Sequence, residues 1–172
     1  MDMPASRTAS AATLAAVALT AGLLTAAPAG AEPNGINGRF AVNSNGEFAK
    51  INERYENQPS EREDWTVSTQ CSAPSMCTGT VVSTAGWTAP IYTINGLWLV
   101  KRAIPNWRYC EDGVPIDGLK TYKIYPVARD GSYDAFYSSG EFAGENYTLG
   151  PSGACGRNQP TAIRMPFYMR KI

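Results

Sequence analysis

The chain has 172 residues, in which 15 lysines and arginines balance 15 aspartates and glutamates, and it contains no histidine. The lack of histidine excludes Ser-His and Cys-His nucleophile pairs and imidazole metal ligands. Zero net charge gives no electrostatic basis for binding nucleic acid. With 44% hydrophobic and 17% charged residues, the composition is that of one globular domain.

The N-terminal segment has the pattern of a secretory signal peptide. Arg7 is followed by an uncharged stretch that is apolar from Ala11 to Leu24 and ends in the small residues Ala29-Gly30-Ala31. Its apolar part is shorter than the ~20 residues that a membrane span requires. We therefore expect cleavage after Ala31, which would leave residues 32–172 as a single secreted domain with no stable membrane anchor.

The rest of the chain is typical of an all-β protein. Asn-Gly and Asp-Gly dipeptides recur along it, and the short runs between them are rich in Val, Ile, Thr, Tyr, Phe and Trp. This pattern predicts a small antiparallel barrel or sandwich of eight to ten short strands with two disulfides.

The first predicted hairpin turns at Asn45-Gly46. A strand near residues 39–43 would pair with one near residues 47–51, so that Val42 faces Ala49. The polar segment 52–64 that follows contains Pro59 and is predicted to be a surface loop with at most one helical turn.

The second predicted hairpin turns at Asn95-Gly96 and pairs residues 91–94 with residues 97–102, so that Tyr92 faces Leu99. Both of its faces are largely apolar, which predicts a central hairpin covered on both sides. The remaining strand candidates are Trp65–Cys71, Cys77–Ser83, Asn106–Cys110, Lys120–Ala128, Tyr133–Ser138 and Ala162–Tyr168.

Four cysteines in an exported chain indicate two disulfides, because the compartment outside the membrane is oxidising. Three pairings are possible. Cys71 and Cys77 would lie at the ends of neighbouring antiparallel strands, which favours a bridge between them and leaves Cys110 to pair with Cys155. A four-cysteine metal site would need closer cysteine pairs, so we expect no metal site and no cofactor.

No catalytic residue is predicted. The stretch Gly150–Ala154 resembles a nucleophile elbow but lacks its last glycine, and no histidine could activate Ser152. The carboxylate pairs that could support glycoside hydrolysis, Asp112 with Asp117 and Glu141 with Glu145, lie in turn-like sequence. Asn146-Tyr147-Thr148 matches the glycosylation acceptor pattern.

Aromatic residues are the remaining candidates for a site. Trp65 and Trp98 lie in strand patterns, which places them in the predicted core. Trp87 and Trp107 lie beside turns and are the weak candidates for binding residues, because an exposed aromatic ring can stack on a ligand.

Several segments together resemble a group of small exported proteins of actinobacteria, chiefly mycobacteria, whose function is unknown. The resemblance is carried by Cys77-Thr78-Gly79-Thr80-Val81, Gly86-Trp87-Thr88-Ala89-Pro90, Asn95-Gly96-Leu97-Trp98, Cys110-Glu111-Asp112-Gly113 and the run from Gly150 to Gly156. It implies an uncharacterised, cysteine-bridged β protein of the cell envelope or culture fluid, and it carries no site residues with it.

We therefore expect a secreted, non-catalytic domain that binds an unknown partner or ligand at the cell envelope or outside the cell. Two alternatives stay open. One is a secreted hydrolase that uses a carboxylate pair. The other is a protein inhibitor that presents the Cys71–Cys77 loop, because a short closed loop lowers the entropy cost of docking.

Overall fold

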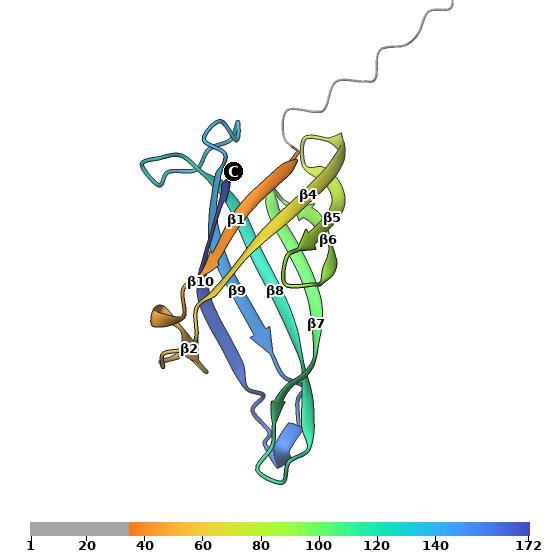
Figure 1. Ribbon diagram of the computed structural model, residues 1–172, viewed down its shortest axis with the longest axis vertical. Helices are drawn as coiled ribbons and strands as arrows, with labels where there is room; N and C mark the ends of the chain where they lie inside the picture. The colour runs from red at the N-terminus through yellow and green to blue at the C-terminus, as the bar shows by residue number, and fades with distance from the viewer. Residues whose placement is uncertain (1–34) are drawn as a thin grey trace, which may run out of the picture. The chain divides into compact units, whose positions relative to one another are not determined.

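The computed structural model describes residues 35–172, so the predicted signal peptide lies outside the described residues. These residues form ten strands and two short 3-10 helices (Figure 1). In chain order they are β1 (Gly38–Ser44), η1 (Gly46–Phe48), β2 (Lys50–Ile51), β3 (Arg54–Tyr55), β4 (Glu61–Ala73), β5 (Met76–Ser83), β6 (Thr88–Ile94), β7 (Leu97–Tyr109), β8 (Pro115–Val127), β9 (Glu141–Leu149), η2 (Ala154–Gly156) and β10 (Ala162–Lys171).

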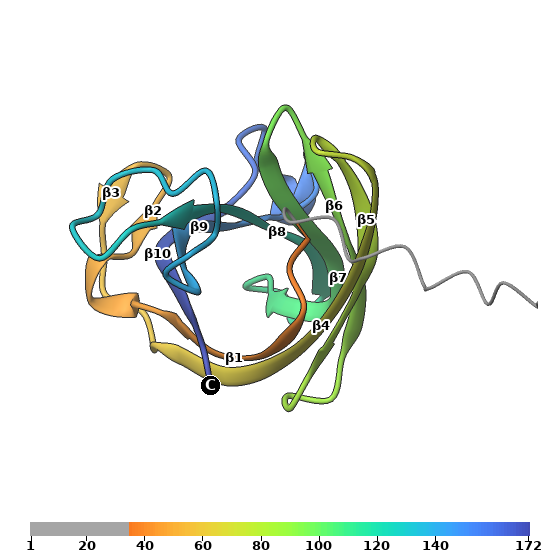
Figure 2. The same cartoon turned by 90° about the horizontal axis from the view of Figure 1, so that it is seen from above.

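Eight of the strands form a closed antiparallel barrel. Around the ring the order is β1-β4-β5-β6-β7-β8-β9-β10, and β10 pairs with β1 to complete it (Figure 2). The small β2–β3 hairpin pairs with Ile163 and Arg164 near the start of β10, ahead of the residues of β10 that pair with β1. The all-β prediction is confirmed, and of the two predicted architectures the structure is a barrel.

The first predicted hairpin is wrong. Residues 46–48 form η1, and β1 pairs with β4 and β10, so that Val42 lies opposite Glu63 and Met169. Asn45 caps η1 by accepting a hydrogen bond from the Glu47 amide. Gly46 is needed for a close backbone approach, because a Cβ there would meet the Gln58 carbonyl oxygen at 1.9 Å. Barrel closure uses both edges of β1, which leaves no edge for a hairpin partner.

The second predicted hairpin has the expected register, with Tyr92 opposite Leu99 and Ile94 opposite Leu97. On its inner face Ile91, Trp98 and Val100 are fully buried, but its outer face is covered only around Leu99, and Ile94 is 50% exposed. A single-layer barrel buries the inner face of every strand, so the expectation of cover on both sides is wrong near the turn.

Three further segments differ from expectation. The predicted strand at residues 133–138 is a loop, because the Asp134 carboxylate accepts hydrogen bonds from the Phe136 and Ser139 amides and from the Ser138 hydroxyl. Residues 61–64, predicted as loop, begin β4. Residues 141–145, taken as turn-like, lie in β9.

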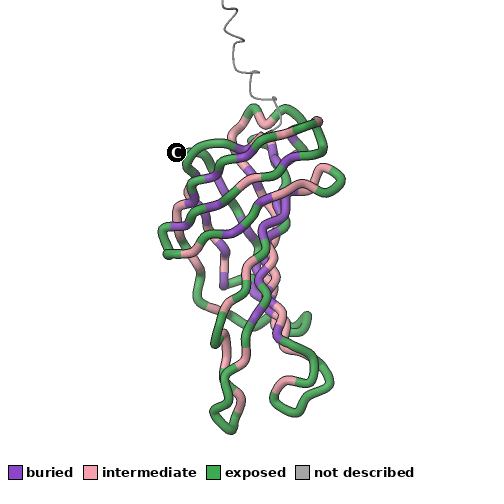
Figure 3. Tube along the Cα trace, turned by 90° about the vertical axis from the view of Figure 1, so that its right-hand side faces the viewer, coloured by how far each residue is buried: buried purple, intermediate pink, exposed green. Residues whose placement is uncertain are grey.

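The barrel interior has two apolar regions. The larger contains the buried residues Phe40, Trp65, Trp98 and Met169, which confirms the predicted core positions of both tryptophans. A smaller cluster of Ala49, Ile163 and Met165, with Trp107 packed against it, lies apart from the larger one. Buried positions alternate with exposed ones along the barrel strands. The end of β7 and the start of β8, which extend beyond the barrel, are largely exposed (Figure 3).

Both disulfides join the predicted partners. Cys71 and Cys77 lie opposite one another in β4 and β5, with their Cα atoms 4.0 Å apart. Cys110, just after β7, is bonded to Cys155 in η2, with their Cα atoms 5.2 Å apart. This second bridge ties the extended β7–β8 hairpin to the segment between β9 and β10.

Candidate functional site: a polar layer inside the barrel

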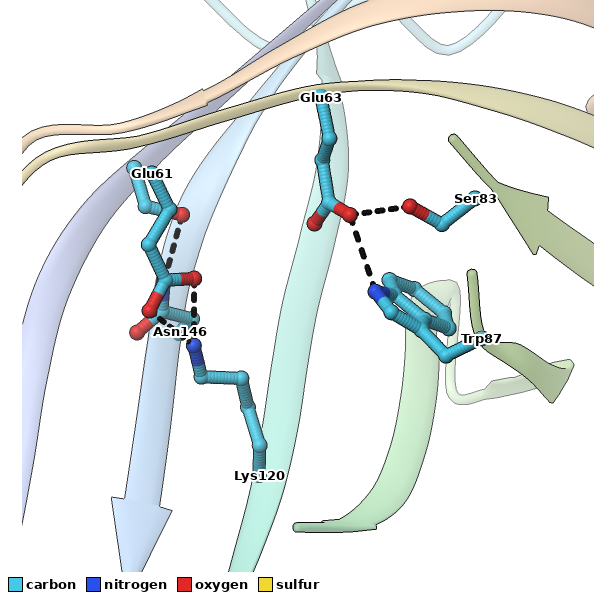
Figure 4. A network of polar contacts seen from close by, with 7 residues as sticks. Glu61, Glu63, Ser83, Trp87, Lys120 and Asn146 are labelled. Carbon is cyan, nitrogen blue, oxygen red and sulfur yellow. Dashed lines mark hydrogen bonds and ion pairs between the residues drawn. The ribbon is translucent and has the colours of Figure 1, made fainter. Parts of the chain in front are cut away.

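Charged and hydrogen-bonding side chains occupy the barrel interior beside the larger apolar core. We call this group the polar layer. Its members are Glu61, Glu63, Ser83, Trp87, Arg102, Lys120, Tyr122 and Asn146 (Figure 4, in which Arg102 and Tyr122 are not drawn).

The period of two along a strand explains how the polar layer forms. On β4, Glu61 and Glu63 are in phase with the buried Trp65 and therefore face inward. On β8, Lys120 and Tyr122 are likewise in phase with Ile124. An eight-stranded barrel is just wide enough to be filled by side chains or to hold one small ligand, so these positions decide what the lumen can bind.

An ion pair crosses the lumen between Glu61 on β4 and Lys120 on β8. The Lys120 side chain is 4% exposed, whereas that of Glu61 is 38% exposed and lies at the edge of the layer. Burial lowers the pKa of Lys120, and the neighbouring Glu61 carboxylate partly offsets that effect. A buried charge is costly unless it is paired, so Glu61 is what permits a lysine at this position.

A second group centres on Glu63. Its Oε2 atom accepts hydrogen bonds from the Ser83 hydroxyl and from the Trp87 Nε1–H, the latter at 2.9 Å. The Arg102 guanidinium lies over the Trp87 ring, 4.5 Å from its centroid. Trp87 is thereby fixed at its edge by a carboxylate and on its face by a cation.

Three buried polar atoms in the layer have no hydrogen-bond partner within residues 35–172. By strict hydrogen-bond geometry they are the Tyr122 Oη, the Arg102 Nε and the Asn146 Oδ1. The Arg102 side chain nevertheless lies near the Tyr122 hydroxyl and partly offsets the rise in its pKa. Tyr122 and Asn146 are both 0% exposed. Native proteins satisfy nearly all buried polar groups, either within the protein or through ordered water, so these three atoms mark a position suited to water or to another small polar molecule.

The electrostatics of the layer are balanced. Two acidic side chains, Glu61 and Glu63, are matched by two basic side chains, Arg102 and Lys120. Burial, followed by the Glu63 and Glu61 carboxylates, raises the pKa of Tyr122, so this phenol is neutral and can donate a hydrogen bond.

Trp107 lies at the end of the lumen next to the layer. It belongs to a bulged part of β7, where the register with β8 shifts between Ile104 and Arg108. Its indole packs on Gly118, where an added Cβ would lie 2.8 Å from the ring and 3.0 Å from Thr148. Gly118 is two residues before Lys120 on the same face of β8, so Trp107 lies next to the polar layer.

The two candidate binding residues pack against different apolar clusters of the barrel. Trp87 is half-buried and is a member of the polar layer, and Trp107 is half-buried beside it. Neither ring is the freely exposed platform that the sequence suggested.

The carboxylate pairs considered from the sequence do not form a site. Asp112 and Asp117 accept hydrogen bonds from the backbone amides of Val114 and Asn106, respectively, and so shape the β7–β8 hairpin. Glu145 pairs with Lys123 and Arg164 on the outside of the barrel. The acceptor asparagine of the glycosylation pattern, Asn146, is fully buried and donates to the Ser44 hydroxyl at 2.6 Å, so the folded domain shields it from modification.

Sequence reasoning missed the charged members of the layer. The signal that could have found them is their phase, because Arg102 follows Trp98 and Val100 at a spacing of two, as Glu61 and Glu63 precede Trp65. Between residues 35 and 172, no group of three or more Cys, Asp and Glu side chains is placed to hold a metal ion. No helix in that part of the chain is long and apolar enough to cross a membrane.

The fold and the bridges define this chain as a disulfide-bridged, eight-stranded β-barrel domain. Among solved structures it is similar to the monomer form of the M. tuberculosis PknI sensor domain, with a TM-score of 0.55 and 14% identity, over 80% of this chain and 87% of that one. At this identity the likeness shows the fold alone. No family model matches the sequence, and no curated protein matches it.

Proposed function

We propose that this chain is an exported, non-catalytic binding domain that takes a small polar molecule at the polar layer of its barrel. The observation that carries the proposal is the set of three unpartnered buried atoms on Tyr122, Arg102 and Asn146. Export is supported by the two disulfides and by the signal-peptide pattern. The same fold serves a sensor domain in the similar structure, which agrees with a binding role.

The chemistry of the layer favours binding over catalysis. Each interior carboxylate is already held by donors of the chain, Glu61 by Lys120 and Glu63 by Ser83 and Trp87. The groups left for a ligand are donors on Arg102 and Tyr122 and an acceptor on Asn146. A molecule that presents an acceptor and a donor would satisfy all three.

The test follows the indole N–H resonance of Trp87 by NMR while acetate, glycine or glucose is added, as one anion, one zwitterion and one neutral polyol. We expect at least one of them to shift this resonance saturably in the wild type and to lose that effect in Arg102→Gln. The matched control is Lys101→Gln, which removes a neighbouring charge from the outer face of β7. A Trp87 resonance that none of the three moves, or a shift that survives in Arg102→Gln, would contradict the proposal.

The inhibitor alternative also has an observation in its favour, because Met76 in the Cys71–Cys77 hairpin is 64% exposed. If this hairpin docks into a protease, Met76→Glu should abolish inhibition of a serine protease that the wild type inhibits. The same variant should leave the Trp87 resonance unchanged, which separates the two proposals.

A further inference from the structure

A hollow lies outside the barrel, between the β7–β8 turn and η2. Its volume is about 520 Å³, within the range of small-molecule sites, and its walls include Arg108, Tyr109, Ile116, Arg157 and the Cys110–Cys155 bridge. The Cys110–Cys155 bridge links the two walls covalently. The separation of the two walls is therefore constrained by a covalent bond.

Of the two arginines that line this hollow, one has an ion-pair partner in residues 35–172 and the other, Arg108, has none. Arg157 pairs with Glu111 at 3.3 Å, and the Asp112 carboxylate accepts the Val114 amide hydrogen bond. Arg108 forms no ion pair with any carboxylate of residues 35–172. It is half-buried, and its guanidinium lies 5.6 Å from the centroid of the Trp107 ring.

An arginine held against an indole keeps its N–H donors free in the plane of the guanidinium. That fork matches the two oxygens of a carboxylate, which can accept two parallel hydrogen bonds. Next to Arg108, the Tyr109 ring is 67% exposed and the Ile116 side chain offers an apolar surface. The hollow thus combines one anion-binding side chain, Arg108, with an apolar surface on which an aromatic ring of a ligand can pack.

We infer that this hollow binds a carboxylate attached to an aromatic or other apolar group, with Arg108 as the residue that recognises the carboxylate. Such a group occurs in free aromatic acids and at the C-terminus of a peptide that ends in an apolar residue. This site is separate from the polar layer and does not depend on the function proposed for it.

The probe is benzoate, compared with benzamide, which has the same shape without the charge. Binding is followed through the Trp107 indole N–H resonance. We expect benzoate to bind saturably to the wild type and benzamide to bind at least about tenfold more weakly, as the loss of a charged hydrogen-bonding pair implies. Arg108→Gln should weaken benzoate binding by a similar factor.

Two further variants make the test specific. Arg157→Gln removes a guanidinium that is already paired in the same hollow and should change benzoate affinity by less than about threefold. Arg108→Lys keeps the charge but loses the fork, so its affinity should lie between those of the wild type and Arg108→Gln. An unchanged thermal midpoint in each variant shows that the domain is folded.

The source of the carboxylate is distinguished with acetyl-Ala-Phe and its C-terminal amide. Tighter binding of this peptide acid than of benzoate assigns a peptide C-terminus, and binding of benzoate alone assigns a free aromatic acid. The inference is overturned if benzoate fails to bind, if benzamide binds equally well, or if Arg108→Gln binds benzoate like the wild type. Arg102→Gln, which disables the polar layer, should leave benzoate binding intact.

Discussion

Lys120 and Glu61 form an ion pair across the lumen, from strands that lie on opposite sides of the barrel ring. The pair joins residues 59 positions apart in the chain, and the lysine is almost fully buried. It therefore links the stability of the barrel to the chemistry of the polar layer.

Replacing only the lysine should destabilise the fold more than replacing both partners. Lys120→Met leaves Glu61 without its cation, and we expect the free energy of unfolding to fall by about 1–3 kcal/mol. Breaking a fully buried ion pair costs ~3–5 kcal/mol, and the smaller loss is expected here because Glu61 is 38% exposed. Glu61→Gln combined with Lys120→Met should recover most of that loss. Urea denaturation measures both, with Lys123→Met in the exposed Lys123–Glu145 pair as the control. A double variant as unstable as the single one would contradict this account.

Alkaline pH should destabilise the domain through Tyr122. Its pKa is raised in the folded state above the ordinary value of 10.0, so above about pH 10 the unfolded chain loses a proton that the folded chain keeps. The free energy of unfolding should then fall by up to about 1.4 kcal/mol per pH unit from this group.

Tyr122→Phe should remove that part of the alkaline loss while costing little at pH 7, because the hydroxyl makes no hydrogen bond of good geometry within the described chain. Urea denaturation at pH 7 and at several values above pH 10 compares the two proteins. If wild type and variant lose stability in parallel, Tyr122 is not responsible.

The contact between Gly118 and Trp107 should be sensitive to a single methyl group. A Cβ at residue 118 would lie 2.8 Å from the indole, so Gly118→Ala should displace Trp107 and cost about 1–3 kcal/mol. Adding Trp107→Phe makes room and should restore part of the stability. Tryptophan fluorescence reports the displacement, and thermal unfolding reports the rescue; the absence of any rescue would mean that the methyl group clashes elsewhere.

The two disulfides should differ in their contribution to stability. The Cys110–Cys155 bridge spans 45 positions and the Cys71–Cys77 bridge spans 6. Loop-closure entropy gives about 4 kcal/mol for the longer loop and about 2 kcal/mol for the shorter one. Removing the long bridge with paired Cys→Ala changes should therefore lower the unfolding midpoint further. Equal midpoints would show that the packing of the buried Cys77 compensates for the shorter loop.

The predicted signal peptide can be checked by mass. Exported protein should have the intact mass of residues 32–172 with four cysteines oxidised, because cleavage after Ala31 precedes folding outside the membrane. Recovery of a membrane-bound species that retains residues 1–31 would contradict it.

Some features of this protein follow from short stretches of sequence. The hairpin at Asn95-Gly96 has its predicted register, because a two-residue turn fixes which residues pair. Cys71 and Cys77 pair as predicted because a tight turn brings them opposite each other, and this leaves Cys110 for Cys155. The all-β class follows from strand-forming runs between turn residues.

Other features exist only because the barrel closes. Asn45-Gly46 has the sequence of a hairpin turn, yet β1 needs both edges for β4 and β10, and this requirement overrides the local preference. From the sequence, Glu61 and Glu63 are predicted to lie in a solvent-exposed loop, because no residue nearby in the sequence could offset the energetic cost of burying two carboxylates. Lys120, Trp87 and Ser83 supply that compensation from distant parts of the chain. Only the tertiary structure therefore makes a charged lumen possible and places Arg102 and Tyr122 beside these groups.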